Sequence, residues 1–365
     1  MHSQYQACFV FPVIVDAYTH QRQQLIDEIR RKPDSKLIIG ADGQYNSPGH
    51  SAHYCTVTAM NLADKKVLTF NPVKITDPSS TSSVVLCTDQ NRQGISMMKS
   101  DYAAISHELD IWRLSKNFKK KISESGKKKE YKELGPWVKQ IRNHIVWAAK
   151  NCRPIAAMIG VTNYDTVLKE LVMSVLHHVT NRHEWASDQS FLHVRYHAPL
   201  THAEIEQRGW IRRGSDAVEA LKKLIVEKLC PLLPQCTMGL FTSELESYHN
   251  LRLKYTPKRP FYERESYNAR SALAVIDHNS NCDRPMLRNV DGEPLFRYKW
   301  SRGSNDWRKK YKRAPKMYTW RKELVRKCIE RLAIGENLVR RRSSFQEVAR
   351  SLDRCGVERP PKPTE

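Results

Sequence analysis

The order of apolar runs along the chain is the feature that most restricts its fold. Within the first 110 residues, five short runs have the apolar, β-branched composition of strands. The runs are 36–42, 54–61, 67–70, 83–88 and 103–110. Short polar connections between the first three predict an antiparallel meander. From Trp112 to about Cys230 the hydrophobic spacing is helical, and no further strand is predicted after this point.

Helices are predicted on both sides of the strands and through the middle of the chain. Their expected ranges are 17–32, 137–150, 164–183, 243–253 and 266–278. The patterns together predict an α/β chain with five parts. These are a strand-rich core (1–110), an all-helical insertion (111–240), a helical return to the core (241–290), a basic extension (291–359) and a disordered, proline-rich tail (360–365).

Two of the predicted strands end in an aspartate, Asp42 after KLIIGA and Asp89 after SVVLCT. If these strands are parallel neighbours, both carboxylates emerge at the same edge of the sheet, where open sheets keep their sites. Carboxylate oxygens are hard ligands for divalent cations. A third acidic residue from elsewhere would complete a two-metal site, with ions about 3.5–4 Å apart. Aspartates that close strands are common, so the pair alone is a weak indication of such a site.

Four segments occur in an order that resembles a known family. They read GADGQYNSPGHSAHY, VVLCTDQNRQGI, LDIWRLSKNFKKKI and TSELESYHN. In this order they resemble the core of eukaryotic transposon-derived proteins with DDE-type catalytic domains, akin to Mutator-like transposases, over residues 10–325. The resemblance implies an RNase H-like mixed sheet with the helical insertion between its second and third acidic residues.

The resemblance assigns the catalytic, metal-binding acids to Asp42, Asp89 and Glu246. These would hold two Mg²⁺ or Mn²⁺ ions for phosphodiester hydrolysis and strand transfer, the chemistry of DNA transposition and recombination. Glu244 competes for the third position, because residues two apart point about 200° apart around a helix. His249 lies on the helix face of Glu246, which favours Glu246.

Four residues are candidates for supporting the metal ligands by hydrogen bonds. They are His50, Asp110, His249 and Asn250. His50 lies in the loop after the first strand, where a role in stabilising a turn is the alternative. Asp110 begins a motif that reads Asp-x-Trp-His in the family, but Arg113 stands here in place of the histidine. Asp110 is therefore expected to support the site or the fold rather than to bind metal.

The basic charge of the chain predicts a polyanionic partner. The formal net charge is +22, and residues 250–345 contain 25 Lys/Arg against 10 Asp/Glu. Aromatic side chains are interleaved with these cations, a pattern suited to stacked bases and phosphates. The candidate DNA-binding residues are Trp300, Trp307, Arg308, Lys309, Lys310, Lys312 and Arg313. A solvated basic face with a few core aromatics is the alternative.

Other classes of protein are disfavoured. No apolar run approaches the ~20 residues of a membrane span, so no membrane association is expected. The nine cysteines contain no CxxC pair, which disfavours a zinc finger or a disulfide framework. A DNA partner predicts a nuclear location. The sequence leaves open whether the chain forms a homo-oligomer.

The segment 71–83 departs from what an RNase H-like sheet requires. It must return the chain from the third strand to the fourth, where the family has a crossover helix, yet it contains Pro72 and Pro78 and no helical pattern. We expect the third strand to end near Phe70 and 71–81 to cross as extended chain. The function predicted is therefore a transposase core that is degenerate. The alternatives are a domesticated, inactive protein that binds DNA or a partner, and an RNase H-like nuclease.

Overall fold

The structure is a computed structural model in which part of the chain is described. The described ranges are 5–32, 36–45, 55–70, 84–90, 92–101, 105–182, 201, 209–258, 260, 262–302 and 306–334. The chain divides into two compact units, one made of Met1–Gln24 with Tyr255–Glu365 and the other of Leu25–Lys254. The segment 71–83, His50 and the tail 360–365 lie outside the described residues, so the predictions made for them stay predictions.

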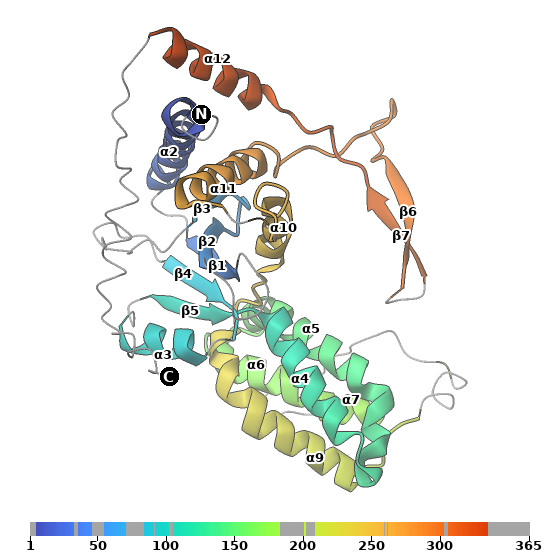
Figure 1. The fold of residues 1–365 in the computed structure, drawn as a ribbon. Helices are drawn as coiled ribbons and strands as arrows, with labels where there is room; N and C mark the ends of the chain where they lie inside the picture. Colours follow the sequence, from blue (N-terminus) through green and yellow to red (C-terminus); the bar gives the residue numbers. More distant parts are fainter. Residues whose placement is uncertain are drawn as a thin grey trace, which may run out of the picture. The chain divides into compact units, whose positions relative to one another are not determined.

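A five-stranded mixed sheet forms in the second unit, from strands close to the five predicted runs (Figure 1). The strands are β1 (Leu37–Tyr45), β2 (Cys55–Asn61), β3 (Val67–Phe70), β4 (Val84–Thr88) and β5 (Ser106–Leu109). Their order is β3-β2-β1-β4-β5, with the first three strands antiparallel and β4 and β5 parallel to β1. The fold is therefore mixed α/β, with the antiparallel meander that the sequence predicted.

Alternating burial fixes the register of the central strands. In β4 the side chains of Val85 and Cys87 are fully buried, and the other three residues of the strand are partly exposed. The helix α3 (Arg92–Ser100) supplies the crossover that the parallel pair β4 and β5 requires.

The prediction that the first strand ends at Asp42 is wrong. The ladder between β1 and β4 stops at Gly40 opposite Cys87, but β1 continues to Tyr45 because it stays paired with β2 as far as Cys55. Asp42 therefore lies in the part of β1 that is still paired with β2 but no longer paired with β4.

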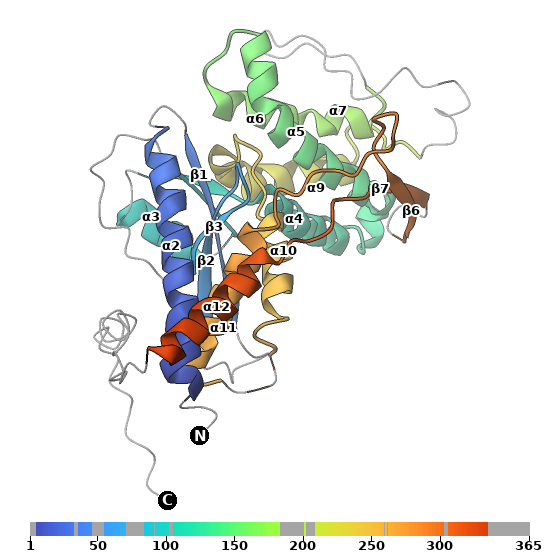
Figure 2. The same cartoon turned by 90° about the horizontal axis from the view of Figure 1, so that it is seen from above.

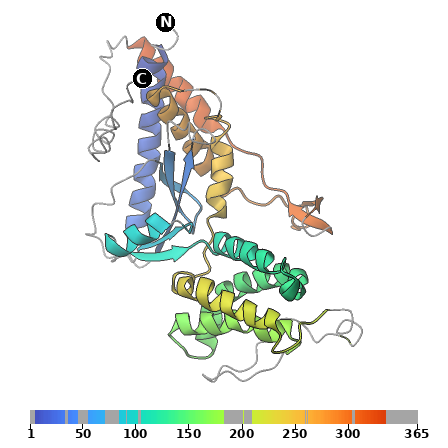
Figure 3. The ribbon, with the colours of Figure 1, turned by 60° about the horizontal axis from the view of Figure 1, so that its bottom comes forward.

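The insertion is helical throughout its described residues, as predicted, and packs beyond the β5 edge of the sheet (Figure 3). Its elements are α4 (Ile111–Ser125), η3 (Lys129–Trp137), α5 (Val138–Met158), α6 (Tyr164–Met173), α7 (Val175–Val179), α9 (Asp216–Leu224), η4 (Ile225–Leu229) and η5 (Cys230–Gln235). They share one apolar core that begins at Leu109 of β5 and ends at Cys236. The helix α10 (Ser243–Arg252) then returns to the sheet and contacts β1.

The other unit contains helices at both ends of the sequence. Its elements are η1 (Gln6–Val10), most of α2 (Phe11–Arg30), α11 (Arg264–Asn279), a hairpin of β6 (Phe296–Ser301) and β7 (Asp306–Tyr311), and α12 (Thr319–Ala333). The guanidinium of Arg331 donates from Nε to the carbonyl of Cys8 at 3.2 Å, which ties α12 to η1 (Figure 2). Before α12, Met317 N–H donates to Asn281 Oδ1 at 2.8 Å, which holds this segment against the end of α11.

The hairpin contradicts the prediction that no strand follows Trp112. β6 alternates aromatic and basic residues with period two, and β7 follows the same pattern except at Lys309, but all their side chains are at least partly exposed. Because neither face is buried in the chain, the aliphatic run that marks a core strand is missing from the sequence.

A buried histidine makes the stability of the insertion depend on pH. Nε2 of His144, in α5, lies 2.7 Å from the carbonyl oxygen of Leu171. Burial lowers the pKa of His144 from 6.5 to about 4. The unfolded chain binds this proton more tightly, so stability is complete above pH 6.5 and falls as the pH drops toward 4. Between pH 7.5 and 4.5 we expect His144 to remove about 2–3 kcal/mol of unfolding free energy.

Urea denaturation at the two pH values tests this. His144→Gln should reduce the difference in unfolding free energy between the two pH values. His20→Gln, at an exposed position, should leave that difference unchanged. An equal acid loss in His144→Gln would contradict the expectation.

Candidate carboxylate site

The register of the parallel strands places two aspartates just beyond the end of one ladder. The ladder between β1 and β4 ends at Gly40 opposite Cys87, and Asp42 and Asp89 each follow two residues later. The negative charge of Asp89 raises the pKa of Asp42, so the two carboxyl groups lie within electrostatic range of each other.

The helix α10 brings Glu246 to the same place. A methyl group on Gly40 would lie 3.0 Å from Leu245 Cδ1, so the missing side chain on β1 allows α10 to pack closely against it. Leu245 is fully buried in this contact, and the next residue, Glu246, is exposed beside Asp42. Glycine in β1 thus sets the distance at which a carboxylate from α10 reaches the strand.

Two further carboxyl groups act on the charge of Asp42. The pKa of Asp42 is raised, first by burial and then by the negative charges of Asp89 and Glu246. The backbone N–H of Gly43, which donates to Asp42 Oδ1 at 2.8 Å, and the charge of Arg113 act in the opposite direction. Residues far apart in the sequence therefore converge on Asp42.

Arg113 lies between two of these carboxyl groups. Its Nη2 is 3.0 Å from Glu246 Oε1 and 4.0 Å from Asp42 Oδ2. Its Nε is buried, and no hydrogen-bond partner for it is found in the described part of the chain. The guanidinium is thus held at the carboxyl groups by charge, in the position where the family motif has a histidine.

Asp110 caps a helix instead of joining the site. Its Oδ1 accepts hydrogen bonds from the N–H groups of Trp112 at 2.7 Å and Arg113 at 3.3 Å, which makes it the N-cap of α4. Its Oδ2 accepts from Thr242, through the backbone N–H at 3.2 Å and through the hydroxyl. Asp110 therefore joins the start of α4, which carries Arg113, to the start of α10, which carries Glu246.

His249 supports Asp42 as a neutral group. Its Nδ1 is 3.8 Å from Asp42 Oδ2, and its Nε2 is 3.4 Å from Thr58 Oγ1. Burial, with the charges of Arg252 and Arg113 adding to it, lowers the pKa of His249 to about 4. At neutral pH the imidazole is uncharged, so its contact with Asp42 is not an ion pair.

Sequence reasoning missed Arg252, which anchors the other end of α10. The side chain is almost fully buried, and it donates to Gln44 Oε1 at 2.9 Å and to Thr56 Oγ1 at 2.8 Å. Its spacing three residues after His249 places it on the same helix face, which was the signal available in the sequence.

The other residues considered for the site lie elsewhere. Glu244 Oε1 accepts from Lys65 Nζ at 2.8 Å and lines a separate hollow with Lys150 and Phe241, so it faces away from the aspartates. Asn250 is exposed on α10.

The side chains as they stand do not fit the pair of divalent ions that the sequence predicted. Over the described ranges, no group of three or more His, Cys, Asp and Glu residues is arranged to hold a metal ion. At this cluster the guanidinium of Arg113 lies between the oxygens of Glu246 and Asp42.

The hairpin has two chemically different faces. Cross-strand pairing puts one set of side chains together as an aromatic face: Phe296, Tyr298, Trp300, Trp307, Lys309 and Tyr311. The opposite basic face presents two pairs of cations, Arg297 with Lys310 and Lys299 with Arg308. Like charges directly opposite each other destabilise a ladder unless an anion lies against them.

The predicted DNA-binding residues divide between these faces and the chain beyond them. Trp300 and Trp307 contact each other at 5.5 Å between ring centroids, and Lys309 Nζ lies 4.6 Å from the ring centre of Phe296. Lys312 lies just after the hairpin, and Arg313 donates to the carbonyl of Cys282 at 3.2 Å.

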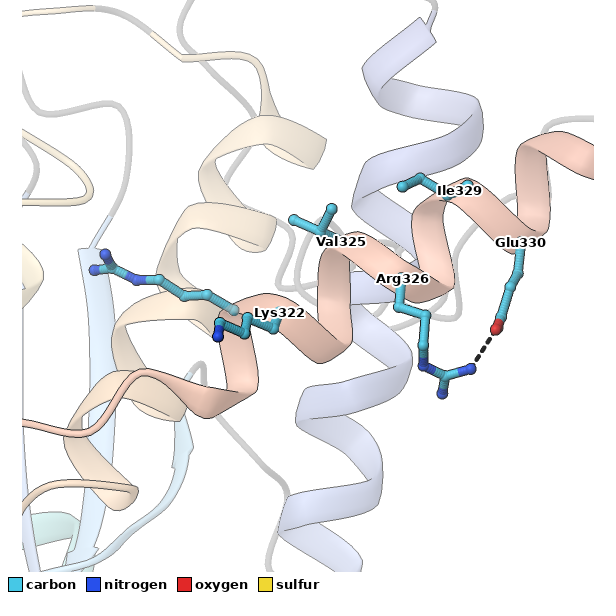
Figure 4. A pocket seen from close by; sticks show the side chains of 6 residues that line it. Lys322, Val325, Arg326, Ile329 and Glu330 are labelled. Carbon is cyan, nitrogen blue, oxygen red and sulfur yellow. Dashed lines mark hydrogen bonds and ion pairs between the residues drawn. The ribbon is translucent and has the colours of Figure 1, made fainter.

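A shallow hollow on α12 does not add a second chemical site. It is lined by Arg321, Lys322, Val325, Arg326, Ile329 and Glu330 (Figure 4). Arg326 and Glu330 pair with each other along the helix, and Val325 and Ile329 are exposed beside them. Glu330, the one acid that lines the hollow, is therefore already paired with Arg326, and the lining residues form no catalytic cluster.

Comparison of the chain with protein-family models, with curated proteins and with solved structures found no significant match. No helix among the described residues is both long and apolar enough to cross a membrane.

Proposed function

We propose that this chain is a DNA-binding protein built on the RNase H-like core of a DDE-type transposase, and that it acts in the nucleus. The observation that carries the DNA partner is the basic face of the exposed hairpin, where cations oppose cations across the ladder. Phosphates could lie along these cations, and the aromatic face would offer stacking surfaces for bases.

The transposase origin is supported by the topology around the acids. The third strand, β3, lies at one edge of the sheet and β4 lies beside β1, which is consistent with the RNase H-like sheet that the resemblance implies. Asp42, Asp89 and Glu246 come from β1, from the end of β4 and from α10, and the helical insertion separates the last two in the sequence. Arg113 within the carboxyl groups favours binding over metal-dependent cleavage.

Metal-dependent cleavage or strand transfer, as in a transposase or an RNase H-like nuclease, is the second candidate function. Its support is that Asp89 and Glu246 both act on the charge of Asp42, because a two-metal site uses acids gathered in this way. A homo-oligomer, which transposition would employ, stays a prediction.

Fluorescence anisotropy with a labelled duplex, together with a nicking assay, separates the two functions. We expect binding whose affinity falls steeply between 50 and 200 mM salt, and no strand cleavage when Mg²⁺ or Mn²⁺ is added. A flat salt response would contradict the DNA partner. Nicking that is lost in Asp42→Asn would instead establish the second function.

A further inference from the structure

The carboxylate site contains its own cation. We propose that the guanidinium of Arg113 takes the place of the metal ions, so that the cluster of Asp42, Asp89 and Glu246 is closed to divalent cations. This rests on the proposed function, because it interprets these residues as a former transposase site.

The first argument is the space between the oxygens. Arg113 Nη2 is 3.0 Å from Glu246 Oε1 and 4.0 Å from Asp42 Oδ2. Mg²⁺ requires oxygen ligands at about 2.0–2.1 Å in nearly octahedral geometry. An ion bridging Glu246 and Asp42 would need the position that the guanidinium occupies, and it would also be repelled by the positive charge.

The second argument is the way in which Arg113 is held. It is the third residue of α4, and its backbone N–H is bound by the N-cap Asp110. Asp110 also holds Thr242 at the start of α10, so the helix that carries the cation and the helix that carries Glu246 are fixed to each other. These contacts fix the two backbone positions from which the side chains of Arg113 and Glu246 reach each other.

The third argument is charge. The negative charges of Asp89 and Glu246 raise the pKa of Asp42, and the positive charge of Arg113 acts in the opposite direction. The guanidinium therefore offsets part of the repulsion that a metal ion would otherwise have to offset. The fold can thus keep the three acids together without metal, which removes the dependence of the site on Mg²⁺.

Removal of the charge at position 113 tests the proposal. Arg113→Gln keeps a side chain of similar length without the charge, and Arg113→Lys keeps the charge as a matched control. Mn²⁺ binding would be measured by calorimetry and by the shift in Tm on addition of Mn²⁺ to metal-free protein. Circular dichroism would check that each variant folds. If Arg113→Gln does not fold, Arg113→Ala would be used in its place.

We expect Arg113→Gln to bind Mn²⁺ at least tenfold more tightly than the parent chain and to melt at a higher temperature with Mn²⁺ than without it. The parent chain and Arg113→Lys should show no such shift, and adding Asp42→Asn to Arg113→Gln should abolish the gain. Mn²⁺ binding by the parent chain that depends on Asp42 would overturn the proposal, and so would an uncharged variant that folds but gains no affinity.

DNA binding by the same proteins keeps this result separate from the proposed function. A parent chain that binds neither DNA nor Mn²⁺, while Arg113→Gln gains Mn²⁺, would contradict the proposed DNA partner and uphold the role of Arg113. A parent chain that binds DNA and also binds Mn²⁺ through Asp42 would uphold the proposed DNA partner and contradict the role of Arg113.

Discussion

Alanine substitution of all four cations on the basic face of the hairpin is expected to weaken DNA binding by about a thousandfold at 0.1 M salt. The four residues are Arg297, Lys299, Arg308 and Lys310. Each phosphate that a cation neutralises contributes about −0.9 to the slope of log K against log salt. Loss of four contacts should therefore make this slope shallower by roughly 3.6, as measured by anisotropy titrations between 50 and 200 mM salt.

A matched variant separates a specific surface from the general field of a basic protein. Lys119, Lys120, Lys121 and Lys127 are exposed on or just after α4, and their replacement by alanine removes the same charge. We expect this variant to lose much less affinity than the hairpin variant and to keep most of the slope. Equal losses in the two variants would show that net charge, not the hairpin, determines binding.

The aromatic face provides a second comparison within the same hairpin. Trp300 and Trp307 are about half exposed, so they can contact bases without unfolding the chain. Their replacement by alanine should weaken binding to single strands more than to duplex, since unpaired bases are free to stack. It should leave the salt slope unchanged, because no charge is removed.

The core sheet could be predicted from the sequence because its strands bury aliphatic side chains. β4 is a run of β-branched and small apolar residues with polar residues on either side, and the structure places its strand within one residue of the predicted range. The hairpin could not be predicted in this way, because its side chains face solvent on both sides and carry a charge pattern that also fits a loop.

The composition of the site followed from the resemblance, but its geometry did not. That Asp42 and Asp89 both lie two residues beyond the last paired residues depends on the register between β1 and β4, which a sequence does not state. The position of Arg113 depends on the direction in which α4 leaves the sheet, and this is set by Asp110 and Thr242 across a separation of 132 residues. The sequence shows that Arg113 stands where the resembled motif has a histidine. The effect of its charge on the site can be inferred only once the positions of the neighbouring carboxyl groups are known.

Asp110→Ala is expected to lower the unfolding free energy by about 2–4 kcal/mol. Loss of an N-cap side chain costs about 1 kcal/mol, and leaving buried donors without an acceptor adds roughly 1–3 kcal/mol. Both losses apply here, because the carboxylate of Asp110 caps α4 and also accepts from Thr242, and both residues are almost completely buried. Urea denaturation with a circular dichroism readout would measure the change.

Thr242→Val supplies the partner for a double-mutant cycle, since it removes the hydroxyl that donates to Asp110 and keeps the shape of the side chain. If the two residues stabilise the fold through their shared contact, the double variant should lose less than the sum of the single losses, by about 1 kcal/mol or more. Strict additivity would mean that the hydroxyl of Thr242 contributes nothing through Asp110. The hydrogen bond from the backbone N–H of Thr242 to Asp110, which Thr242→Val keeps, would then be the link between the helices that carry Arg113 and Glu246.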